Sequence, residues 1–143
     1  MINKILIIPK ISPDLDGLAC AYAYRRLLAK QGKNVTEGIF GHPHAEAQYL
    51  IDRFQIDDIV FSPSGLFDSF ILVDASDMAG MPDIIRVKDV TEVIDHREIH
   101  KAHEFFSKAK IQIEKVGAAA TQIAEQYQNA NIPIDRNSAI LLY

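Results

Sequence analysis

The hydrophobic and polar positions of this chain alternate between short, continuously apolar runs and longer segments with helical spacing. Six segments predict strands, at residues 5–9, 34–40, 58–61, 69–74, 91–95 and 110–114. Four segments predict helices, at residues 17–30, 44–54 and 117–127 and in a last segment that Asp135 caps and that runs to Tyr143. Apolar strands separated by helices are typical of a mostly parallel sheet. We therefore predict an α/β fold with helices on both faces of such a sheet.

Length and composition narrow the class of protein. The chain has 143 residues, of which 48% are hydrophobic, and this suits a single globular domain over residues 1–143. A net charge of −4 is the opposite of what a protein dedicated to duplex DNA carries. The apolar start of the chain is too short for a membrane span. We therefore expect no duplex DNA and no membrane among its partners.

The single cysteine and the apolar end of the chain carry two further expectations. Cys20 has no second cysteine to pair with, which favours a reducing, cytoplasmic environment and a buried structural thiol. Residues 138–143 form an apolar run, whereas chain ends are usually polar and exposed. We expect this run either to continue into a longer protein or to be buried in a homo-oligomer.

Acidic residues follow three of the predicted strands. Asp14 and Asp16 come after the first strand, Asp74 ends the fourth, and Asp95 and His96 come at the end of the fifth. Ligands of open α/β sheets bind at the carboxyl ends of the strands. Carboxylates gathered there repel one another unless a cation is present, and Mg²⁺ or Mn²⁺ prefers such oxygens with one imidazole added. The sequence therefore predicts a divalent metal site at this edge.

Each of these residues also has an ordinary structural interpretation. Asp14 or Asp16 could cap the following helix, Asp74 could cap a loop, and His96 could be a core histidine. Their coincidence at three strand ends favours a site over three independent structural roles. The other histidines are expected in solvated loops or on helix surfaces: His42, His44, His100 and His103. No cysteine completes a zinc site around them.

Four segments stand in the order of a known set of motifs: 13–16 (PDLD), 73–77 (VDASD), 93–97 (VIDHR) and 116–121 (VGAAAT). Over essentially the whole chain they resemble the DHH phosphoesterases, which include inorganic pyrophosphatases, exopolyphosphatases, oligoribonucleases and cyclic-dinucleotide phosphodiesterases. The resemblance implies a Rossmann-like domain that hydrolyses phosphoesters or phosphoanhydrides. In such a mechanism a pair of metal ions ionises a water molecule for attack on phosphorus.

The resemblance also assigns roles to single residues. It implies that Asp14 and Asp16 bind two different metal ions, that Asp74 bridges them, and that His96 binds the second. Asp95 is expected to support these ligands without binding metal itself.

The chain departs from the family's pattern at several positions. Lys10 stands where the family has a metal-binding histidine, and an ammonium has no lone pair for a metal. Arg97 replaces a second histidine that contacts the substrate phosphate, and Ala118 replaces a serine. The family's last metal-binding aspartate and its C-terminal substrate-binding domain would fall beyond Tyr143. We therefore expect weak activity or none from this chain.

Lys10 also changes the expected metal content. Its positive charge beside Asp14 and Asp74 predicts at most one divalent ion, held by Asp16, Asp74 and His96.

Two functions remain open on the sequence alone. The first is a metal-dependent phosphoesterase acting on a small phosphorylated substrate or a short oligonucleotide. The second is a non-catalytic module of the same fold, in which Lys10 and Arg97 bind a phosphate or nucleotide. A dinucleotide-binding oxidoreductase is excluded, because no Gly-x-Gly-x-x-Gly follows the first strand.

Overall fold

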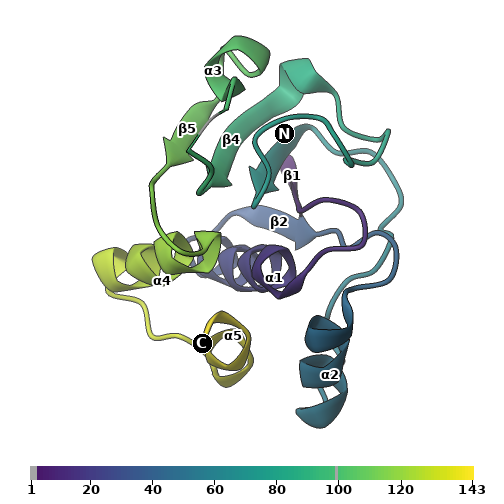
Figure 1. The fold of residues 1–143 in the computed structure, drawn as a ribbon, viewed down its shortest axis with the longest axis vertical. Coiled ribbons are helices and arrows are strands. Elements are labelled where there is room, and N and C mark those ends of the chain that lie inside the picture. Colours follow the sequence, from purple (N-terminus) through teal and green to yellow (C-terminus); the bar gives the residue numbers. More distant parts are fainter. Residues whose placement is uncertain (1–2, 99) are drawn as a thin grey trace.

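The computed structural model describes residues 3–98 and 100–143. Its centre is a five-stranded sheet in the order β2-β1-β3-β4-β5 (Figure 1). The strands are β1 (Lys4–Ile8), β2 (Asn34–Glu37), β3 (Ser69–Val73), β4 (Val90–Asp95) and β5 (Lys110–Ile113). Every neighbouring pair is parallel. The predicted α/β class is confirmed, and the carboxyl ends of all five strands lie along one edge.

Within residues 3–98 and 100–143, five α-helices and one 3₁₀ helix accompany the sheet. The α-helices are α1 (Leu15–Lys30), α2 (Ala45–Arg53), α3 (Ala102–Phe105), α4 (Ala119–Ala130) and α5 (Arg136–Leu142), and the 3₁₀ helix is η1 (Val87–Asp89). Figure 1 shows α4 and α5 lying beside α1, and α3 at the β5 side of the sheet. No helix among the described residues is long and apolar enough to cross a membrane.

The two faces of the sheet bury two separate cores. Side chains alternate across a strand, so Ile5 and Ile7 face one side and Leu6 and Ile8 face the other. The first core lies under α1, α4 and α5 and includes Cys20, which is fully buried as predicted. The second core is covered mainly by irregular chain between β3 and β4, with the short helix α3 at one end.

One predicted strand does not form. Residues 58–61 make only a single bridge, between Ile39 and Phe61, beside the edge strand β2. The backbone turns directly after it, where Ser62 has a φ of 44°. The predicted strand at 34–40 ends early, at Glu37. Gly38 follows it at a crowded position that favours glycine, because a Cβ there would lie 2.9 Å from Leu6 Cδ1 and 3.1 Å from a Pro63 ring carbon.

The apolar end of the chain packs largely within its own domain. Asp135 caps α5 by accepting a hydrogen bond from the Ser138 backbone, as predicted. Leu141 is buried in the first core, whereas Tyr143 is 81% exposed. Self-association through this segment stays a prediction.

Candidate metal centre

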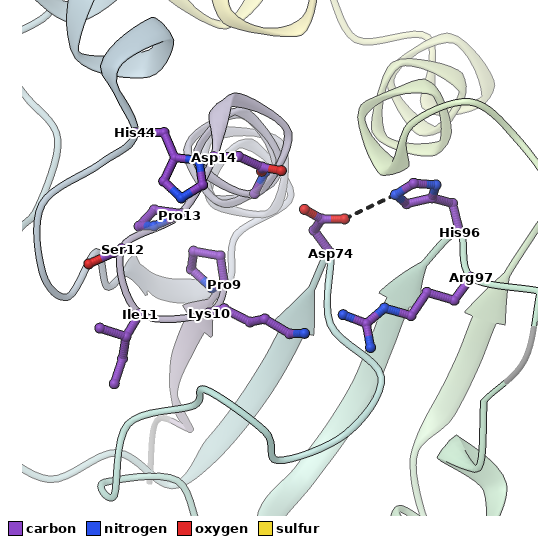
Figure 2. Close-up of a pocket in the computed structure, with 11 residues that line it drawn as sticks. Pro9, Lys10, Ile11, Ser12, Pro13, Asp14, His44, Asp74, His96 and Arg97 are labelled. Carbon is purple, nitrogen blue, oxygen red and sulfur yellow. Dashed lines mark hydrogen bonds and ion pairs between the residues drawn. The ribbon is translucent and has the colours of Figure 1, made fainter.

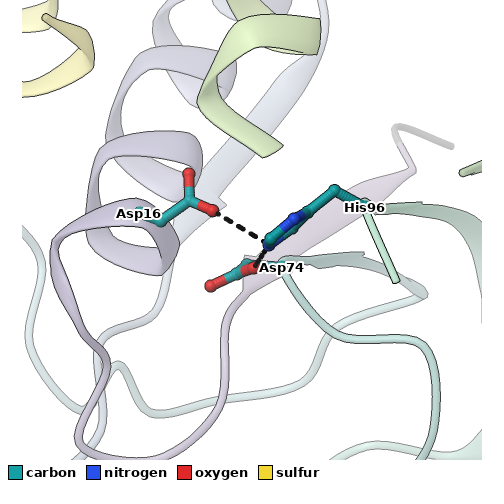
Figure 3. A group of neighbouring side chains, drawn as sticks. All are labelled: Asp16, Asp74 and His96. Atoms are coloured by element: carbon teal, nitrogen blue, oxygen red, sulfur yellow. Dashed lines mark ion pairs between the residues drawn. The ribbon is translucent and has the colours of Figure 1, made fainter. Parts of the chain in front are cut away.

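Three potential metal ligands converge at the carboxyl edge of the sheet. Asp16 lies in the first turn of α1, Asp74 directly follows β3, and His96 directly follows β4. One ligand atom of each lies within 4.8 Å of the others (Figure 3). The Nε2 atom of His96 is 3.2 Å from Asp74 Oδ1 and 3.5 Å from Asp16 Oδ2. Two carboxylates and one imidazole are a suitable ligand set for a divalent ion such as Mn²⁺.

The backbone around Asp74 turns sharply to present its carboxylate. Asp74 has a φ of 53°, and its N–H donates a 2.8 Å hydrogen bond to the carbonyl of Ile94. Gly17, at the start of α1, lies close to both Pro9 and Asp74, with the tighter contact to Pro9. A Cβ at that position would lie 3.5 Å from Asp74 Oδ2 and 3.1 Å from Pro9 Cβ. The first turn of α1 and the end of β3 therefore meet closely at the candidate site.

Asp16 is held by the amino end of another helix. Its carboxylate accepts hydrogen bonds of 2.9 Å from Ala119 N and 2.8 Å from Ala120 N. The N-cap residue of α4, Ala118, makes no side-chain cap of its own. Asp16 therefore satisfies free amides of α4 and places a negative charge at the positive end of its dipole.

The contact of the other ring nitrogen of His96, Nδ1, bears on the tautomer of the imidazole. His96 Nδ1 lies 3.3 Å from the carbonyl oxygen of Val116, which can only accept a hydrogen bond. A proton on Nδ1 can donate to this carbonyl, and a ring without a proton on Nε2 would present that nitrogen's lone pair to a metal ion between Asp16 and Asp74. A backbone acceptor behind a metal-binding imidazole is a common way to orient it.

The charge at the site also suits a cation. The pKa of Asp74 is raised from 3.8 to about 8, first by burial and then by the negative charges of Asp16, Asp14 and Asp95. Without a cation these carboxylates oppose one another's ionisation. A divalent ion would remove this conflict, so the residues present fit a metal.

A pocket of about 450 Å³ opens beside these ligands (Figure 2). Its lining includes Lys10, Asp14, Asp74, His96 and Arg97. Asp14 lies outside the group of three converging ligands and caps α1, accepting a 3.0 Å hydrogen bond from Gly17 N. The helix-cap interpretation therefore describes Asp14, and its role as a metal ligand stays a prediction.

Two aspartates hold the side chain of Arg97. Arg97 Nε lies 3.4 Å from Asp95 Oδ2, and Nη1 lies 3.4 Å from Asp77 Oδ2. Asp95 is fully buried, and its other oxygen accepts a 2.8 Å hydrogen bond from His96 N. Asp95 therefore contacts both the guanidinium of Arg97 and the backbone of His96, without joining the group of ligands.

Among the ionisable residues that line the pocket, His44 was not predicted as a site residue. His44 is exposed, as expected, but it also lines the pocket at the N-cap position of α2. Its backbone N–H donates a 2.9 Å hydrogen bond to Pro13 O and so ties α2 to the loop before α1. The only signal in the sequence was its position after the second predicted strand. His103 is exposed on α3, and His100 just before it is partly buried.

Comparisons with known proteins point to one family. The chain is 31% identical over 145 residues to the manganese-dependent inorganic pyrophosphatase of Bacillus subtilis, covering 98% of this chain and 46% of that protein. It is 29% identical over 147 residues to the corresponding Methanothrix thermoacetophila protein, covering 99% and 46%. The chain thus spans about half the length of these relatives.

Solved structures agree on the fold. A Methanococcus jannaschii protein, provisionally assigned as a family II inorganic pyrophosphatase, superposes with a TM-score of 0.74 at 22% identity, covering 96% of this chain and 45% of its own. An exopolyphosphatase-related protein from Bacteroides fragilis gives 0.67 at 15% identity, covering 99% and 44%. Residues 4–143 match the N-terminal domain of the DHH family, and the chain therefore belongs to that family.

Proposed function

We propose that this chain is a metal-dependent hydrolase domain that cleaves a phosphoanhydride or phosphoester. One observation carries the proposal. The converging group of Asp16, Asp74 and His96 borders a pocket that also contains the cations of Lys10 and Arg97. Metal ligands beside fixed positive charges are what hydrolysis of a charged phosphate compound requires.

The metal is Mn²⁺ or Mg²⁺, with Asp16, Asp74 and His96 as its ligands. The carboxylate and imidazole set suits both ions, and the names of the related pyrophosphatases favour manganese. When bound, such an ion lowers the pKa of a water molecule and neutralises phosphate oxygens.

Residues of the chain itself position the substrate. Lys10 and Arg97 bind its phosphate, and the ion pairs to Asp95 and Asp77 hold the guanidinium in place. The expected substrate is small: pyrophosphate or polyphosphate first, in view of the relatives, and a short oligonucleotide second.

The test is release of phosphate from pyrophosphate by the chain with Mn²⁺, beside the Asp74→Asn variant. We expect turnover well below the enzyme median of about 10 s⁻¹, because the chain supplies only about half the length of its relatives. Asp74→Asn should abolish it. Equal phosphate release by the two variants would contradict the proposal.

The second candidate is a phosphate-binding module without turnover. Lys10 favours it, because this pocket residue is a cation that cannot bind a metal. The same assay separates the two functions when binding of pyrophosphate is measured in parallel. Tight binding with no Mn²⁺-dependent release at any Mn²⁺ concentration would establish the module and rule out the hydrolase.

A further inference from the structure

Asp14 and Asp16, at the start of α1, make different contacts. Asp16 points its carboxylate to the converging ligands and to the amino end of α4. Asp14 caps its own helix with one carboxylate oxygen and lies outside that group. In the described part of the chain, a single set of three residues has the geometry for a metal ion, and Asp14 lines the pocket beside it.

Lys10 lines the pocket together with Asp14, Asp74 and Arg97. Figure 2 shows its ammonium extending toward the space below Asp74, with the guanidinium of Arg97 on the other side. The hydrocarbon part of Lys10 lies over Gly80, where a Cβ would be 3.7 Å from Lys10 Cδ. A 2.8 Å hydrogen bond from Ile11 N to Gly80 O fixes the same loop. The hydrocarbon part of Lys10 is therefore packed against this loop, and the side chain lines the pocket.

We propose that the ammonium of Lys10 takes the place of a second metal ion, so that the chain binds one divalent ion per molecule. This inference rests on the proposed function and specifies its metal content. Lys10 brings a positive charge to the Asp14 and Asp74 side of the pocket and offers no lone pair. A second divalent ion there would lack a ligand and would meet a like charge.

For substrate binding, the site would then combine one exchangeable metal ion with two cationic side chains, Lys10 and Arg97. A phosphate group would contact the metal ion on the His96 side, with Lys10 and Arg97 as permanent partners. Part of the phosphate affinity should therefore persist when the metal is removed, because these two cations belong to the chain.

The experiment counts Mn²⁺ ions by calorimetric titration and checks their separation by electron paramagnetic resonance. Wild-type protein should bind one Mn²⁺ and show the spectrum of an isolated ion. Lys10→His should raise the number to two and give the spectrum of a coupled pair. Lys10→Met removes the charge without adding a nitrogen ligand and serves as the matched control, with one ion expected.

A further variant tests the division of labour between the aspartates. Asp14→Asn should leave the single Mn²⁺ bound, because asparagine also caps helices and Asp14 is outside the ligand group. Asp16→Asn should lower the affinity at least tenfold.

The outcomes separate this inference from the proposed function. Two ions in the wild type would overturn the inference and leave the hydrolase proposal standing. One ion in both wild type and a folded Lys10→His variant would also overturn it, because Lys10 would not be what excludes the second ion. Absence of Mn²⁺ binding by the wild type would instead contradict the proposed function.

Discussion

Asp16 accepts a 2.9 Å hydrogen bond from the backbone N–H of Ala119, 103 residues further along the chain. This bond joins the first turn of α1 to the first turn of α4, and a second bond to Ala120 N strengthens the junction. The same carboxylate lies 3.5 Å from His96 Nε2. Asp16 therefore links helix packing to the candidate metal site.

The first prediction concerns this junction without metal. In the presence of a chelator, Asp16→Ala should lower the free energy of unfolding by about 1–3 kcal/mol, because two amides at the start of α4 lose their acceptor. Urea denaturation measures the change. Asp16→Asn keeps one acceptor oxygen and should lose less. Equal stability of Asp16→Ala and the wild type would show that Asp16 does not hold α4.

Asp14 provides a second stability prediction. Its side chain caps α1 through Gly17 N, so Asp14→Ala should cost about 1 kcal/mol, the usual value for losing an N-cap. Asp14→Asn should be close to the wild type, because asparagine caps equally well. Thermal unfolding in a chelator compares the three proteins. If Asp14→Asn lost as much stability as Asp14→Ala, the negative charge of Asp14, and not its capping hydrogen bond, would account for the stabilisation.

Metal addition and removal give the third prediction. Mn²⁺ at about 100 times its dissociation constant should raise the free energy of unfolding by about 2.7 kcal/mol, because it binds the folded state alone. A chelator should reverse the gain, and Asp74→Asn should not show it. Asp52→Asn makes the same chemical change at an exposed position on α2 and should keep the full gain.

Phosphate binding supplies the fourth prediction. Arg97→Ala should weaken the binding of inorganic phosphate by roughly tenfold, which corresponds to one charge-assisted hydrogen bond of about 1.5 kcal/mol. Calorimetry measures the affinity. Arg53→Ala, which removes an exposed arginine from α2, is the control and should leave the affinity unchanged. Unchanged affinity in Arg97→Ala would remove Arg97 from the phosphate site.

The fifth prediction is a pH dependence that originates away from the site. Glu37 at the end of β2 is fully buried, and burial raises its pKa above the usual 4.5, although the guanidinium of Arg25 opposes the shift. The folded state then binds more protons than the unfolded state above pH 4.5. The contribution of Glu37 to the free energy of unfolding is therefore fully present below pH 4.5. It is lost as the pH rises through the folded-state pKa of Glu37.

Glu37→Gln provides the comparison, because glutamine does not titrate. We expect the wild type to lose stability relative to Glu37→Gln as the pH rises above 4.5, as measured by denaturant unfolding in a chelator. Parallel pH profiles of the two proteins would contradict a raised pKa for Glu37.

The main strands, the longer helices and the order of the motifs could be predicted from the sequence. Continuous apolar runs predicted β1 and β3 because a strand buried on both faces has no polar positions to interrupt it. The parallel arrangement then brought Asp74 and His96 to one edge, since the strands before them end there. These conclusions depend on local periodicity and on the direction of neighbouring strands, which the chain encodes over short distances.

Which side chains meet at the site became known from the three-dimensional fold. Asp14 and Asp16 are two residues apart, yet one caps α1 and the other reaches α4 and His96. His44 joins the pocket through a hydrogen bond to Pro13, and residues 58–61 remain outside the sheet. Such contacts join segments far apart in the sequence. They depend on how helices and loops pack against the sheet, which local hydrophobic spacing does not specify.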